Sequence, residues 1–211
     1  MALTLSQGAR WVCIGDSITD CGRRECPEQI GVGYVRLIRD WLRAAQPATA
    51  PEVINRGISG NKIGDLQGRW DEDVLALKPD LVSIKIGIND VWHGLGGEQN
   101  GTPLDKFEEG VSDILQRLES ACPQTKIVLC EPSVIWPPSP QEGNEVLQPY
   151  IEAIRKLGAV FKVECVVPLH GAFVQSREAR SDIDWAPDGV HPGSSGHMLI
   201  ARTWLAAMGL L

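Results

Sequence analysis

A serine stands where an apolar run gives way to residues that begin helices. Trp11–Ile14 is long enough for one buried strand and ends at Gly15, which permits a tight turn. The polar residues that follow, Asp16, Ser17 and Thr19, favour the start of a helix. A serine at such a junction has free backbone N–H groups beside its hydroxyl, an arrangement that can hold an oxyanion. Ser17 is therefore a candidate nucleophile for acyl transfer, and a plain helix N-cap is the alternative.

Two later apolar runs also end in unusual turns, at residues 57–61 (Gly-Ile-Ser-Gly-Asn) and 87–90 (Gly-Ile-Asn-Asp). Ligands of an open parallel sheet bind at the carboxyl ends of its strands. If these strands neighbour the first, Ser17, Gly60 and Asn89 meet at one edge. The backbone N–H groups of Ser17 and Gly60 and the side-chain NH₂ of Asn89 would then form an oxyanion hole. Each turn alone is equally compatible with ordinary turn chemistry.

A general base for the serine is expected in the loop before the last predicted helix. Asp188 and His191 are three residues apart there. The carboxylate can fold back to accept a hydrogen bond from the ring Nδ1–H, which leaves Nε2 free to take the serine proton. Asp182 and Asp184 are rival orienting acids that lie farther along the chain. His93 stays a second candidate because it follows one of the unusual turns.

Composition excludes several classes of function. The 211 residues are 43% hydrophobic and 22% charged, which is typical of a globular protein, and we expect one domain over residues 1–211. The formal charge of −7 argues against nucleic acid as a partner. No apolar segment approaches the roughly 18 residues of a membrane span, so no membrane partner is expected. The first residues show no signal-peptide pattern, which predicts a cytoplasmic location.

Cysteine and histidine show no metal-binding pattern. The six cysteines form no C-x-x-C pair, and free thiols are expected, although Cys21 and Cys26 are close enough in sequence to pair. The four histidines match no ligand spacing, and His197 is interpreted as a packing or surface residue. The sequence therefore predicts neither a metal nor another cofactor.

Short apolar runs alternate with helical patterns, which is typical of an α/β protein with a parallel sheet. The predicted strands are Trp11–Ile14, Glu52–Asn55, Leu81–Ile86, Lys126–Cys130 and Phe161–Val166. Residues 91–102 are expected to form a Gly-rich loop, and 131–143, with four prolines, to be irregular. A helix is predicted to run to about Leu77, and the segment after Val166 is uncertain. Trp41 and Trp204 are expected in the core, and so is Met198 on the last helix.

Four blocks, in order and over nearly the whole chain, resemble those of the GDSL, or SGNH, hydrolase superfamily. They are Gly15-Asp16-Ser17, Gly60, Gly87-Ile88-Asn89-Asp90 and Asp188-x-x-His191. The resemblance implies a flavodoxin-like three-layer α/β/α sandwich around a parallel sheet of about five strands. It also implies a serine esterase with Ser17 as nucleophile, His191 as base and Asp188 as its partner. The oxyanion hole would come from Ser17, Gly60 and Asn89.

Longer matches resemble small bacterial acetylxylan esterases of this superfamily. They cover residues 15–23, 57–61, 69–70 (Arg-Trp), 87–92 and 142–144. This similarity implies that acetyl groups are removed from xylan-derived sugars, such as acetylated xylo-oligosaccharides. The expected partner is that oligosaccharide or another small-molecule ester, and assembly into a homo-oligomer is left open.

Substrate contacts and rival functions complete the predictions. Trp92, Trp136 and Trp185 fall in loops beside the proposed edge, where indoles can pack against sugar faces, and Asp16 is the fourth candidate contact. Ordinary, partly buried loop tryptophans are the alternative.

A second enzyme function is a broad short-chain or aryl carboxylesterase, or a thioesterase. A non-catalytic nucleotide-binding α/β domain ranks lowest, because the chain contains neither G-x-G-x-x-G nor a P-loop.

Overall fold

The computed structural model describes residues 6–95, 100–140 and 142–211. At its centre lies a parallel sheet of five strands in the order β2-β1-β3-β4-β5. The strands are β1 (Arg10–Gly15), β2 (Glu52–Gly57), β3 (Leu81–Lys85), β4 (Lys126–Cys130) and β5 (Cys165–Val167). The predicted α/β class with a parallel sheet of about five strands is confirmed.

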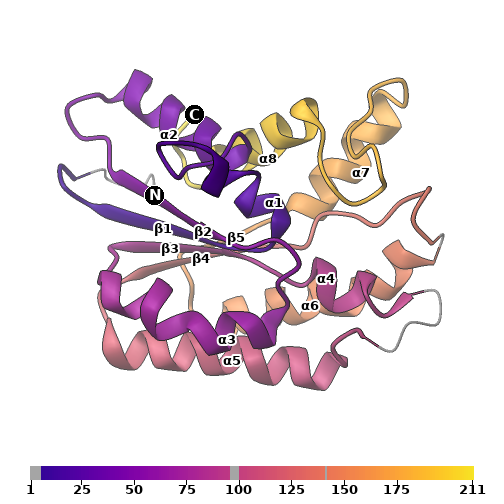
Figure 1. The fold of residues 1–211 in the computed structure, drawn as a ribbon, viewed down its shortest axis with the longest axis horizontal. Coiled ribbons are helices and arrows are strands. Elements are labelled where there is room, and N and C mark those ends of the chain that lie inside the picture. Colours follow the sequence, from indigo (N-terminus) through magenta and orange to yellow (C-terminus); the bar gives the residue numbers. More distant parts are fainter. Residues whose placement is uncertain (1–5, 96–99, 141) are drawn as a thin grey trace.

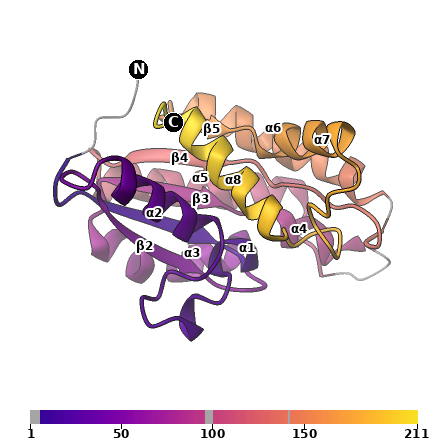
Figure 2. The same ribbon diagram turned by 90° about the horizontal axis from the view of Figure 1, so that it is seen from above.

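Helices cover both faces of the sheet, which explains why the central strands β1, β3 and β4 are buried along nearly their whole length. One layer holds α2, α7 and α8 with the short α1, and the other holds α3, α5 and α6 with the short α4 (Figure 1). Figure 2 shows α2 and α8 side by side on the first of these faces. The helix bounds are α1 (Ser17–Asp20), α2 (Tyr34–Ala45), α3 (Ile63–Asp73), α4 (Ile88–Trp92), α5 (Leu104–Ala121), α6 (Gly143–Val160), α7 (Leu169–Ala179) and α8 (Ser194–Ala207).

Several predicted elements differ in extent. The strand predicted at Phe161–Val166 is only Cys165–Val167, because Phe161 ends α6 and Lys162 adopts a left-handed turn with φ of 48°. The uncertain segment that follows forms α7. The helix predicted to reach Leu77 ends at Asp73 and is followed by a 3₁₀ turn. Residues 131–140 are irregular as predicted, and residue 141 lies outside the described residues. Gly143, predicted to be irregular, is instead the first residue of α6.

The predicted loop 91–102 also needs correction, because Val91 and Trp92 belong to α4. The helix predicted after it begins at Leu104. Residues 96–99 of that loop lie outside the described residues. Among the expected core residues, Trp204 is fully buried, whereas Trp41 is 45% and Met198 53% exposed. The core expectation was therefore wrong for these two side chains, which lie at the margin of the buried stripe on their helices.

The strand order brings three turns together. β1 lies between β2 and β3, in register from Gly15 to Gly57 on one side and from Gly15 to Lys85 on the other. The turns that follow these strands therefore leave the sheet from adjacent positions at its carboxyl edge. In the part of the chain that the structure describes, no helix has the length and hydrophobicity needed to cross a membrane.

Candidate active site

The turn after β1 exposes the serine hydroxyl and buries the residues on either side. Asp16, not Ser17, is the N-cap of α1, because its Oδ1 accepts a hydrogen bond from the Ile18 N–H at 2.9 Å. Ser17 is the first residue of the helix, so its Oγ is free for another partner. Gly15 is required by space, since a Cβ there would collide with the carbonyl oxygen of Lys85. The N-cap alternative for Ser17 is thus wrong.

Ser17, His191 and Asp188 form one chain of hydrogen bonds. The Ser17 Oγ lies 2.8 Å from His191 Nε2, and His191 Nδ1 lies 2.6 Å from Asp188 Oδ2. With the carboxylate accepting from Nδ1–H, Nε2 presents its lone pair to the serine hydroxyl, which donates to it. The His191 side chain is 40% exposed, so a substrate can reach the pair from solvent. This arrangement suits a nucleophile, a general base and an orienting acid.

The carboxylate of Asp188 is held ionised. Partial burial alone would raise its pKa, but hydrogen bonds from the His191 ring and from the backbone N–H groups of His191 and Val190 outweigh burial and lower the pKa below its ordinary value. Both N–H groups donate to Oδ1, at 2.7 and 2.9 Å, which leaves Oδ2 for the ring. The short Asp-x-x-His turn therefore fixes the ring tautomer through its own backbone.

The Pro-rich segment before α6 is hydrogen-bonded to the loop that carries Asp188 and His191. The Trp136 N–H donates to the Gly189 carbonyl at 2.8 Å, and the Ser139 hydroxyl donates to the Asp188 carbonyl at 3.0 Å. On the other side, the Trp92 ring meets the His191 ring edge-on, with the centroids 5.6 Å apart. Sequence reasoning missed the role of Ser139, since a serine in an irregular segment carries no signal of its partner.

The three turns proposed for the oxyanion hole are bonded to one another. The Ile58 N–H donates to the Gly15 carbonyl at 3.1 Å, and Asn89 Nδ2 donates to the Asn61 carbonyl at 3.0 Å. That bond uses one of the two Nδ2 hydrogens, so the second is left for a ligand. Among the described residues, none accepts a hydrogen bond from the Gly60 N–H, and Gly60 adopts φ of 81°, which favours glycine. Donors suited to an oxyanion are thus present in the turns beside Ser17.

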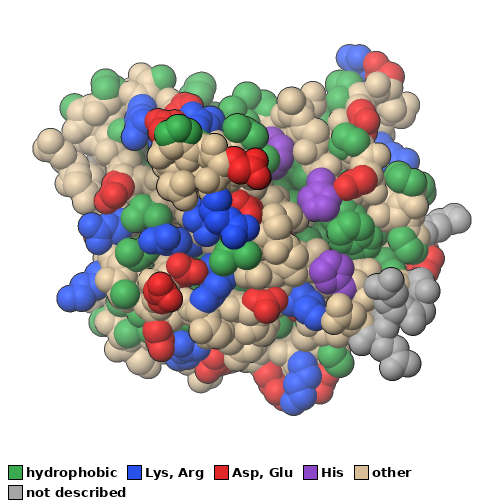
Figure 3. Space-filling model, in the orientation of Figure 1, with side chains coloured by type: hydrophobic (Ala, Val, Ile, Leu, Met, Phe, Trp, Pro, Cys, Tyr) green, Lys and Arg blue, Asp and Glu red, His purple; other side chains and the backbone are tan. Residues whose placement is uncertain are grey.

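The four candidate substrate contacts lie in different surroundings. Asp16, predicted as a substrate contact, is fully buried and caps α1, so it presents no exposed surface to a substrate in this structure. Trp92 lies against the His191 ring. Trp136 and Trp185 line a separate cavity of about 220 Å³ beside residues 186–187, just before the aspartate of the loop. Figure 3 shows histidine side chains beside hydrophobic surface on the right half of the face, where the strands end.

The rival residues have other partners. Asp182 forms an ion pair with Arg180 at 2.6 Å, and Asp184 lines the tryptophan cavity. His93 lies beside the ring of Trp92 and is not part of the hydrogen-bonded chain.

All six cysteines are free thiols. In residues 6–95, 100–140 and 142–211, no three His, Cys, Asp or Glu side chains are grouped so that they can hold a metal ion.

Comparison with known proteins identifies the family. The family model of the GDSL-like Lipase/Acylhydrolase family matches residues 13–199, from β1 into α8. The chain belongs to this family. It is a carboxylic ester hydrolase, so the alternative of a non-catalytic nucleotide-binding domain is wrong.

Known proteins match this chain over nearly its whole length. The chain is 36% identical to an acetylxylan esterase of Geobacillus stearothermophilus, over 98% of this chain and 97% of that protein. A crystal structure of that kind of enzyme from the same organism, 32% identical, superimposes with a TM-score of 0.87 over 98% and 97% of the two chains. A Parabacteroides merdae protein described as a GDSL-like lipase, 33% identical, covers 100% of both chains with a TM-score of 0.92.

Catalytic mutants of the Geobacillus stearothermophilus enzyme have also been solved. Their descriptions name one serine, one aspartate and one histidine, each replaced by alanine. The aspartate and the histidine are three positions apart in that enzyme, as Asp188 and His191 are in this chain.

Proposed function

We propose that this protein is a serine esterase that removes acetyl groups from carbohydrate esters such as acetylated xylo-oligosaccharides. Ser17 is the nucleophile, His191 the general base and Asp188 its orienting partner. One observation carries the proposal: the hydrogen-bonded chain from Ser17 Oγ through the His191 ring to the Asp188 carboxylate. The full-length similarity to an acetylxylan esterase supports the choice of acyl group and alcohol.

The reaction is a two-step acyl transfer. The Ser17 oxygen attacks the acetyl carbonyl carbon while its proton moves to His191 Nε2, and the developing oxyanion is held by the N–H groups of Ser17 and Gly60 and by the Asn89 amide. His191 then gives the proton to the sugar oxygen as the ester bond breaks. Water repeats the sequence on the acetyl-enzyme, which releases acetate and returns the proton to Ser17.

The Asp188 carboxylate supports both steps by electrostatics. It keeps the proton of neutral His191 on Nδ1 and stabilises the imidazolium that forms when Nε2 takes the serine proton. Its lowered pKa keeps it ionised through the neutral and mildly acidic pH range.

The free thiols are consistent with a reducing compartment, and we propose that the enzyme acts in the cytoplasm.

The test compares Ser17→Ala with Ser120→Ala. Ser120 is exposed on α5, where its hydroxyl bonds only within its own helix, so it controls for loss of a serine hydroxyl. We expect Ser17→Ala to lower kcat on an acetyl ester by about 10³-fold or more, and Ser120→Ala to leave it unchanged. Full activity of Ser17→Ala would overturn the assignment.

The substrate is tested separately with the wild-type protein. Acetylated xylo-oligosaccharides are compared with simple acetyl, butyryl and octanoyl esters at equal concentration. We expect the highest kcat/KM for the acetylated oligosaccharide and a steep decline with acyl length. Equal values for all four would favour a broad short-chain carboxylesterase over a carbohydrate deacetylase.

A further inference from the structure

The guanidinium of Arg69, on α3, reaches into the turns that surround the serine. Its Nε donates to Asn61 Oδ1 at 2.8 Å, its Nη1 to the Arg56 carbonyl at 2.8 Å, and its Nη2 to the Gly15 carbonyl at 3.1 Å. A fourth bond from Nη1 to Asp73, at 2.6 Å and one helical turn later, fixes the guanidinium in place. The side chain of Arg69 is only 15% exposed.

Two of these acceptors, Gly15 and Asn61, lie beside the proposed oxyanion donors. Gly15 lies two residues before Ser17, and its carbonyl oxygen also accepts from the Ile58 N–H. Asn61 follows Gly60 directly, and its own carbonyl accepts from the Asn89 amide. One side chain therefore connects the end of β1 with the turn that contains Gly60 and accepts the hydrogen bond from Asn89.

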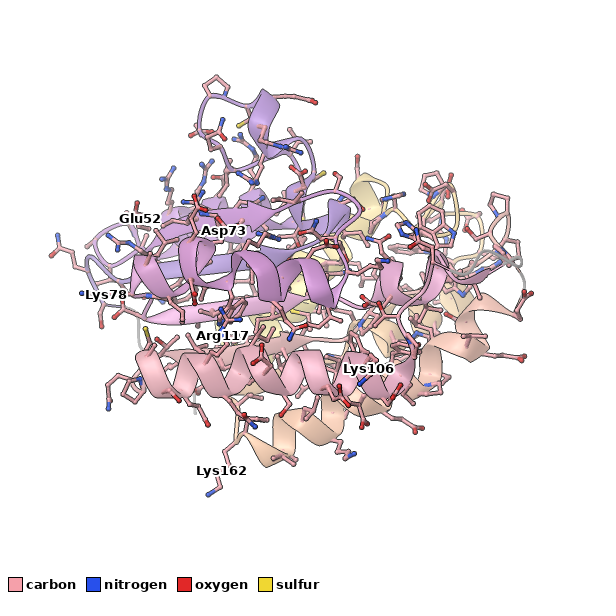
Figure 4. All side chains as sticks on the ribbon, turned by 60° about the horizontal axis from the view of Figure 1, so that its bottom comes forward. Glu52, Asp73, Lys78, Lys106, Arg117 and Lys162 are labelled. Atoms are coloured by element: carbon pink, nitrogen blue, oxygen red, sulfur yellow. The ribbon has the colours of Figure 1, made fainter. Side chains whose placement is uncertain are left out.

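We propose that Arg69 is a positioning residue that sets the geometry of the oxyanion hole without touching the substrate. Four donated bonds in different directions require the planar fork of a guanidinium, and a lysine ammonium on a flexible stem cannot reproduce them. Figure 4 shows Asp73, its anchor, on the side of α3 that faces β2. The inference rests on the proposed function of the three donors. It adds the residue that fixes their positions relative to one another.

Loss of this fork displaces the donors, and the displacement weakens binding of the tetrahedral intermediate more than binding of the ester. The oxyanion hole acts on charge that develops in the transition state, so small displacements lower kcat and leave KM nearly unchanged. A purely structural role predicts a different result, in which less protein folds but each folded molecule keeps its kcat.

The test uses Arg69→Met and Arg69→Lys, with Arg117→Met as the matched control. Arg117 is a part-buried arginine on α5 that also donates to α3, at the Gln67 carbonyl and the Asp71 carboxylate, but its bonds lie away from the turns (Figure 4). For each variant, kcat and KM are measured on a chromogenic acetyl ester. Active sites are counted from the end point of labelling at Ser17 by a serine-directed fluorophosphonate, and the inhibition constant of a trifluoromethyl ketone is measured.

We expect both Arg69 variants to lose about 10–100-fold in kcat per labelled site with KM within about threefold, and to bind the ketone correspondingly more weakly. Arg117→Met should keep the wild-type values. Arg69→Lys retains the charge and most of the volume, so it still tests the positioning role if Arg69→Met fails to fold. Wild-type kcat and ketone affinity in Arg69→Lys would overturn the inference while Ser17 is still labelled. Activity without labelling at Ser17 would instead refute the proposed function, and the inference with it.

Discussion

The contact between α8 and the start of α2 makes stability depend on pH. His197 Nδ1 accepts a hydrogen bond from the Tyr34 N–H at 3.2 Å, and Nε2 lies 3.4 Å from the Cys21 sulfur. Burial, with smaller contributions from the charges of Lys85 and His191, lowers the pKa of His197 from its ordinary 6.5 to about 4. Protonation of Nδ1 would break the bond to Tyr34, so the folded protein holds this ring neutral.

The sign and size of the effect follow from linkage. A histidine whose pKa is lower in the folded state contributes stability above pH 6.5, and this is lost as the pH falls through 6.5 to about 4. A difference of about 2.5 pH units corresponds to about 3 kcal/mol of unfolding free energy. His197→Asn keeps an acceptor near the Nδ1 position but cannot be protonated. Between pH 7.5 and pH 4, wild type should therefore lose about 3 kcal/mol more than this variant.

Urea unfolding at several pH values measures this difference, and an NMR titration of the His197 ring gives its pKa directly. Comparing wild type with His197→Asn at each pH cancels the titration of the other groups that the two proteins share. The reasoning would be refuted by parallel stability curves for the two proteins, or by a ring pKa of 6 or higher.

Three further substitutions test the site. Asn89→Ala should lower kcat by about 10²–10³-fold through the lost oxyanion donor, with KM little changed in steady-state kinetics. Asp188→Asn should lower kcat by about 10⁴-fold, because an amide can favour the wrong His191 tautomer, and unaltered kcat would contradict the orienting role. Gly15→Ala should destabilise the fold by about 1–3 kcal/mol in urea unfolding, because the added methyl group collides with the Lys85 carbonyl; an unchanged midpoint would show that the turn has room.

The sequence was sufficient to predict the strands and the turns of the candidate site where local chemistry and sheet topology agree. Apolar runs that end in Gly15 and Gly87 predict strands that are followed by ligand-binding turns, and β1, flanked by β2 and β3, has the neighbours that this prediction required. The Asp188-x-x-His191 spacing implied a folded-back carboxylate, because a bond across three residues depends on local geometry. The observed 2.6 Å contact has that geometry.

Features that depend on partners far along the chain could not be predicted. Whether Asp16 or Ser17 caps α1 depends on His191, which comes from the loop before α8 and engages the serine hydroxyl. The burial of Trp41 depends on how far α8 covers α2, and its indole N–H instead donates to the Leu210 carbonyl near the end of the chain. The Arg69-Trp70 pair was noted as a motif, but the acceptors of the guanidinium lie on three separate segments.

The most direct test of the proposed mechanism is to trap the acetyl-enzyme. The protein is mixed with an acetyl ester, quenched in acid during turnover, digested and analysed by mass spectrometry. The mechanism predicts one acetyl group on the peptide that contains Ser17, and none in Ser17→Ala. An acetyl group on another residue, or undiminished hydrolysis by Ser17→Ala, would contradict it.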